Sequence, residues 1–152
     1  MTNPRALLPS IALLLMLPLK AEAIKESDLP ANEKEKFQAV MKTLYADKQS
    51  DFYKKLTEYK QAFRDAMVKA DASVAPILDK VIPVSGAAQM KASELPADEA
   101  EKYKAAQKAA KAADPSIAQK DAARKQAQRE AMIKADPSIQ PIVDKVIPSA
   151  AQ

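Results

Sequence analysis

The sequence predicts an all-α protein made of two tandem copies of a helical hairpin plus a short C-terminal lid helix. A single glycine and an abundance of Ala, Lys, Glu and Gln favour helix, because these residues lose little side-chain freedom there. Branched apolar residues nowhere alternate with polar ones over a run long enough for a strand. A third observation is a duplication, since KADASVAPILDKVIP (69–83) recurs as KADPSIQPIVDKVIP (134–148) with eleven identical positions.

Residues 1–23 have the layout of a secretory signal peptide. A basic start at Arg5 precedes an apolar run over 6–19, and Ala21 and Ala23 place small residues where a signal peptidase reads them. The apolar run is short for a membrane span, which needs about 20 residues. We therefore expect cleavage after Ala23 and a periplasmic or secreted mature chain. An uncleaved membrane anchor is the alternative.

Copy one is expected over residues 24–83, with one helix over 31–46 and a second over 51–70. Pro30 and the acidic residues after it suit the first turn of a helix. Two matching apolar stripes joined by a short turn should fold back as an antiparallel hairpin. The stripes consist of Phe37, Val40, Met41 and Leu44 in the first helix and Phe52, Leu56, Tyr59, Phe63 and Met67 in the second.

The repeated segment follows the second helix and predicts a short helix that Ser73 caps and Pro83 ends. Its apolar positions, Ile77, Leu78, Val81 and Ile82, have helical spacing, while Asp79 and Lys80 are expected to point to water. We interpret this helix as a lid over the open end of the hairpin. A recognition helix is the alternative.

A linker over 84–94 leads to copy two, which spans 95–148 and leaves a tail at 149–152. Copy two keeps the plan of copy one but loses its large apolar residues, and its first helix offers mostly alanine. The loss predicts that burial stabilises copy two by several kcal/mol less. Copy two could therefore pack tightly, lean on copy one or stay partly loose until a partner arrives. Phe52, Leu56, Tyr59 and Phe63 correspond to Ile117, Asp121, Arg124 and Gln128.

The residue types argue against catalysis. Without histidine or cysteine, the chain cannot assemble the usual pairs of nucleophile and base or the usual transition-metal ligands. Each acidic residue lies within a few positions of a lysine or arginine, as on a solvated helix face. We expect no enzyme activity, no catalytic residue, no cofactor and no metal site.

Surface contacts are the remaining candidates. Tyr53 lies off the main apolar stripe, and Lys120, Arg124, Lys125 and Arg129 belong to a cation-rich stretch of copy two. Cations of this kind attract acidic proteins, anionic lipid or nucleic acid. Interspersed acidic residues and export disfavour nucleic acid, and any membrane contact should be peripheral. A protein partner or client is the main expectation, with self-association as a second.

The two helix openings, LPANEKEKF (29–37) and LPADEAEKY (95–103), together with the leader and the lack of cysteine, resemble the small periplasmic helical proteins of the Spy/CpxP type. That resemblance implies an all-helical, often dimeric, ATP-independent chaperone or envelope-stress sensor. The LTxxQ motif of the group is missing, because neither opening has its threonine or glutamine.

We therefore expect an exported, non-enzymatic helical-repeat protein that binds other proteins or envelope components, with chaperone-like action as the specific form. The alternatives are a structural or self-assembling envelope protein and a binder of anionic lipid or nucleic-acid surfaces.

Overall fold

The computed structural model describes residues 22–84 and 88–149, and every regular element in these ranges is helical. The order of elements repeats, since a 3₁₀ turn, two α-helices, another 3₁₀ turn and a short α-helix occur twice, although the 3₁₀ turn that opens the second set, Ala92–Glu94, lies in the expected linker. The fold class is all-α, as predicted. The α-helices are α1 (Ala31–Ala46), α2 (Asp51–Ala70), α3 (Ala75–Val81), α4 (Ala97–Ala113), α5 (Ser116–Ala135) and α6 (Gln140–Val146).

Most of the expected signal peptide lies outside the described residues, so the leader and its cleavage stay predictions. The middle of the linker and the last three residues of the tail also lie outside them. Among the described helices, none combines the length and the apolar character needed to cross a lipid bilayer.

Local sequence signals set the helix ends. The side chain of Ser50 accepts a hydrogen bond from the backbone amide of Tyr53 at 3.2 Å, which satisfies one of the unpaired donors at the start of α2. The expected cap at Ser73 is wrong. The acceptor is Asp71, which receives the backbone amide of Ser73 at 2.9 Å and so begins the 3₁₀ turn before α3. Pro76 lies in the first turn of α3, where its missing N–H leaves no bond unmade.

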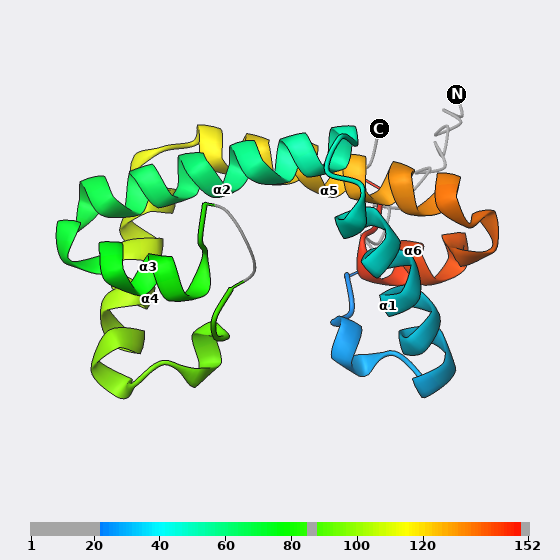
Figure 1. The fold of residues 1–152 in the computed structure, drawn as a ribbon, viewed down its shortest axis with the longest axis horizontal. Coiled ribbons are helices and arrows are strands. Elements are labelled where there is room, and N and C mark those ends of the chain that lie inside the picture. Colours follow the sequence, from blue (N-terminus) through cyan, green and yellow to red (C-terminus); the bar gives the residue numbers. More distant parts are fainter. Residues whose placement is uncertain (1–21, 85–87, 150–152) are drawn as a thin grey trace, which may run out of the picture.

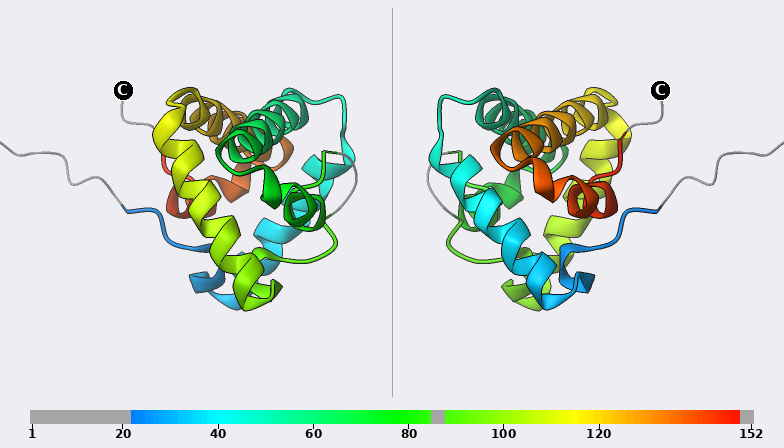
Figure 2. Two further views of the ribbon diagram at one scale, coloured as in Figure 1. Left: turned by 90° about the vertical axis from the view of Figure 1, so that its left-hand side faces the viewer. Right: turned by 90° about the vertical axis from the view of Figure 1, so that its right-hand side faces the viewer.

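The two long helices lie side by side in opposite directions (Figures 1 and 2). In Figure 1 they run along the top of the molecule, with α3 and α4 below one end and α1 and α6 below the other. Each end of the α2 and α5 pair therefore carries one first helix and one lid helix.

The structure does not confirm the tandem hairpin arrangement. Helix α1 makes few contacts with α2 and packs mainly on α5, with further contacts to α6, while α4 packs on α2 and α3. The first helix of each copy therefore packs on the long helix of the other copy. The sequence could not distinguish these pairings because both bury the same apolar stripes.

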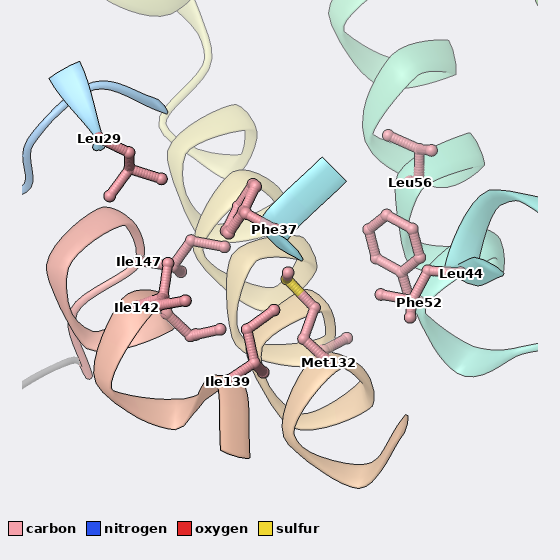
Figure 3. Close-up of a cluster of buried hydrophobic side chains, with 11 residues drawn as sticks. Leu29, Phe37, Leu44, Phe52, Leu56, Met132, Ile139, Ile142 and Ile147 are labelled. Atoms are coloured by element: carbon pink, nitrogen blue, oxygen red, sulfur yellow. The ribbon is translucent and has the colours of Figure 1, made fainter. Parts of the chain in front are cut away.

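Two hydrophobic cores result, and each takes side chains from both copies. The first core, shown in Figure 3, joins α1 and the start of α2 to the end of α5 and to α6. The second joins the end of α2 and α3 to α4 and the start of α5. Buried members of the first core are Leu29, Phe37, Leu44, Phe52, Leu56, Ala127, Met132, Ile139, Ile142, Val143 and Ile147, and those of the second are Phe63, Met67, Val74, Ile77, Leu78, Leu95, Tyr103, Ala106, Ala110 and Ile117.

This sharing resolves the three outcomes left open for copy two. Its small residues Ala106 and Ala110 are buried in a core whose large members, such as Phe63 and Met67, come from copy one. The core around the alanines of copy two therefore depends on large side chains of copy one, and the core around α1 depends on the branched residues of α6. Within the described residues, neither copy has a core of its own.

Asp79 is exposed, as expected, and Lys80 is partly exposed, but both charged residues of the repeated segment also have partners. Lys80 donates to Glu99 of the other copy at 2.7 Å, and Asp79 pairs with Arg64 of its own copy at 2.6 Å. The equivalent pairs in copy two are Lys145 with Glu33 at 2.8 Å and Arg129 with Asp144 at 2.5 Å. The Asp and Lys of DKVIP are thus repeated because each makes an equivalent ion pair in both halves of the structure.

Candidate functional site

The symmetry of the two copies is broken near the middle of α5, where a polar cluster replaces aromatic residues. The guanidinium of Arg124 donates to Oδ1 of Asp121 from Nη2 at 2.7 Å and from Nε at 3.1 Å. Its Nη1 donates to Oε1 of Gln128 at 3.2 Å, and its face lies 5.4 Å from the ring centroid of Tyr59. Lys125 approaches the other oxygen of Asp121 at 2.8 Å. These contacts fix the Arg124 guanidinium in one orientation.

The equivalent positions of copy one carry rings instead. Tyr59 and Phe63, which correspond to Arg124 and Gln128, stack with centroids 5.6 Å apart, and the Lys111 ammonium lies 5.7 Å from the Phe63 centroid. In that half the aromatic residues come from the long helix and the cation from the first helix.

The other half reverses these roles. Helix α5 supplies the polar residues, and α1 supplies Met41 and Tyr45 where α4 has Gln107 and Lys111. The Gln128 amide donates to the Met41 sulfur at 3.1 Å. A polar side chain on one helix is therefore matched by an apolar or aromatic side chain on the helix that packs against it.

A pocket of about 880 Å³ opens in this half, between α1, α5 and the end of α6. We call it the Arg124 pocket. Its walls combine apolar side chains from all three segments with the fixed guanidinium of Arg124 and the Gln128 amide. The lining residues are Ala23, Glu26, Phe37, Met41, Tyr45, Ala122, Ala123, Arg124, Lys125, Gln126, Gln128, Val146, Ile147, Pro148 and Ser149.

Titratable groups around the pocket are perturbed in accord with this geometry. Burial raises the pKa of the Tyr45 hydroxyl, and the nearby charges of Arg124 and Glu26 act on it in opposite directions. Burial also raises the pKa of Asp121, but hydrogen bonds from Lys125 and Arg124 outweigh it, so the pKa lies below its ordinary value. Asp121 is therefore ionised at neutral pH and holds both cations.

The five surface residues singled out in the sequence fall into three places. Arg124 and Lys125 line the Arg124 pocket. Tyr53 and Lys120 both line a second, more open pocket of about 670 Å³ along α2. Arg129 lies at neither, because its guanidinium donates to the backbone carbonyl of Ile147 at 3.1 Å and pairs with Asp144.

Sequence reasoning missed Met41, Tyr45 and Gln128 as members of one site. Met41 was assigned to the hairpin stripe, and Gln128 was counted as a lost core residue. A signal was available, because Tyr59/Arg124 and Tyr45/Lys111 are positions at which the copies differ in chemical type, and Tyr45, Tyr59 and Arg124 lie close together here.

No cluster of three or more potential ligands for a metal ion is found in the described part of the chain. The fold and the pocket together define an all-α protein in which segments of both copies line an open pocket of apolar and charged side chains. No family model, curated protein or solved structure matches the chain.

Proposed function

We propose that this chain is an exported, non-enzymatic protein that binds other proteins or envelope components and acts in a chaperone-like way on unfolded chains. The Arg124 pocket carries the proposal, since it places fixed polar groups beside an apolar wall of Phe37, Met41 and Ile147. Its volume of about 880 Å³ falls in the usual range for ligand pockets, which extends to roughly 1,000 Å³. Such a pocket suits a large apolar side chain whose backbone needs hydrogen-bond partners.

The composition of the wall supports clients of varied sequence. Met41 is flexible and polarisable, which suits irregular apolar surfaces. Tyr45 is 45% exposed, so its ring presents an apolar face together with a hydroxyl at the opening. Selective binding of one rigid ligand would favour a more enclosed site.

The test is suppression of client aggregation by the purified mature chain. We expect near-equimolar protein to slow the aggregation of an unfolded client, and Ala122→Trp to remove most of this effect by filling the pocket. Ala118→Trp is the matched control, because Ala118 is also exposed on α5 but does not line the pocket. Equal activity of both variants would contradict the proposal.

A second candidate is binding to anionic surfaces. Lys104, Lys108 and Lys111 are exposed on α4 at helical spacing, so they share one face of the helix. This function predicts an affinity for anionic vesicles that falls steeply with salt, and a flat salt profile would remove it.

A further inference from the structure

Two cations of α5, Arg124 and Lys125, line the Arg124 pocket, while the carboxylate that they share does not. Arg124 and Lys125 share the single carboxylate of Asp121, with contacts of 2.7 and 2.8 Å. With Asp121 and Glu26 both counted, two cations face two carboxylates, so an anionic group would be recognised through the donors of Arg124 and not through a net charge. The pocket itself is lined by these two cations and by one carboxylate, that of Glu26.

The donors of Arg124 are only partly used. A guanidinium has five N–H groups, and three hydrogen bonds to Asp121 and Gln128 account for three of them in the described part of the chain. The remaining donors belong to a group that is already held in place. Binding an acceptor there costs little further ordering, which favours affinity.

The one carboxylate that lines the pocket already accepts a hydrogen bond. Glu26 lies on the segment before α1, and its Oε1 accepts a hydrogen bond from the Gln38 amide at 2.8 Å. The Arg124 side chain is 18% exposed, so a carboxylate that reaches it loses much of its competing water. An anionic group is therefore favoured at the Arg124 end.

We infer that the partner segments taken by the Arg124 pocket are acidic, with a glutamate or aspartate beside a large apolar residue. The apolar side chain packs against Phe37, Met41 and Ile147, while the carboxylate accepts from Arg124 and pairs with Lys125. This inference rests on the proposed function and specifies the chemistry of the client.

Paired peptides test it with the full mature protein. The two peptides share the same leucine and phenylalanine residues and differ only in carrying glutamate or glutamine beside them. We expect calorimetry to show about tenfold tighter binding of the glutamate peptide, the size expected for a hydrogen bond to a charged group.

Variants locate the preference. Lys125→Gln should reduce it to about threefold, because this lysine is more exposed than Arg124 and its pairing is partly screened. The matched control is Lys60→Gln, the equivalent position in copy one, which should leave the preference unchanged. Arg124→Gln should abolish it, and circular dichroism checks that this variant folds. If Arg124→Gln does not fold, Lys125→Gln still tests the preference.

The outcomes separate this inference from the proposed function. Equal binding of the two peptides, with client suppression still lost in Ala122→Trp, would overturn the acidic preference and leave the binding function standing. Loss of the preference in Lys60→Gln but not in Lys125→Gln would also overturn it. Absence of peptide binding together with unchanged suppression in Ala122→Trp would overturn both.

Discussion

The Lys145 ammonium donates to both carboxylate oxygens of Glu33, each at 2.8 Å, although the two residues lie 112 positions apart in the sequence. The equivalent pair, Lys80 with Glu99, joins the lid of copy one to the first helix of copy two. Both pairs cross from one copy to the other. They show that the duplicated segment serves to connect the copies as well as to close each core.

The exchange of first helices can be tested by cross-linking, because the chain has no cysteine to interfere. We expect Glu33→Cys with Lys145→Cys to be joined within one chain by a short bismaleimide, as peptide mapping by mass spectrometry would show. A hairpin within each copy would instead bring residue 33 near residue 80. The pair Glu33→Cys and Lys80→Cys is therefore the control, and efficient linking in that pair alone would refute the exchange.

The tight packing of the cores predicts that enlarging two neighbouring alanines, one buried and one exposed, should change the free energy of unfolding unequally. Ala110 is fully buried in the second core, so Ala110→Leu should lower the free energy of unfolding by about 1–3 kcal/mol through overpacking. Exposed Ala109 offers the control, where leucine should change it by less than about 0.5 kcal/mol. Leu44, which corresponds to Ala110, should cost about 2–5 kcal/mol when replaced by alanine. Urea denaturation measures all three, and a neutral Ala110→Leu would contradict this packing.

Arg129 was a candidate surface contact, but its contacts in the fold predict a structural role. Its side chain is 12% exposed and reaches both Asp144 and the Ile147 carbonyl. Two different nitrogens of the guanidinium make these contacts and lysine has only one nitrogen, so Arg129→Lys should lower the free energy of unfolding by about 1–3 kcal/mol. Client binding by the folded variant should be unchanged. Weaker binding without a loss of stability would restore Arg129 as a contact residue.

Acid should destabilise the protein through its turn-capping aspartates. Hydrogen bonds from the serine two residues further on, first from its side chain and then from its backbone, lower the pKa of Asp71, Asp114 and Asp136 below the ordinary 3.8. A lowered pKa in the folded state gives stability that is present above 3.8 and lost as the pH falls through the folded values. Melting temperature should therefore drop below about pH 4.

Asparagine separates charge from hydrogen bonding at these three positions, since its side-chain oxygen still accepts. The triple Asp→Asn variant should melt with a shallower pH dependence in this range. Part of the slope should persist, because the pKa of Asp121 is also lowered. An unchanged slope would mean that the three aspartates do not contribute.

The sequence predicted the helices well because their signals are local. The bounds 31–46 and 51–70 agree with α1 and α2, and they follow from apolar spacing, proline and capping residues within a few positions. Arg124 and Lys125 were predicted as contacts from their charge alone. The pocket that they line could not be predicted, because Phe37, Met41 and Ile147 reach it from distant parts of the chain.

The sequence by itself determined that the described chain is helical, duplicated and unequal in its two copies. Only the tertiary structure decided which first helix packs on which long helix. A duplicated chain offers two pairings with the same apolar spacing, and spacing cannot rank them. The two pairings differ in energy because the packed side chains differ in size and charge. In the observed pairing, alanines of α4 pack against large residues of copy one, and Met41 and Tyr45 of α1 lie near Gln128 and Arg124 of α5. These differences act only between surfaces in contact.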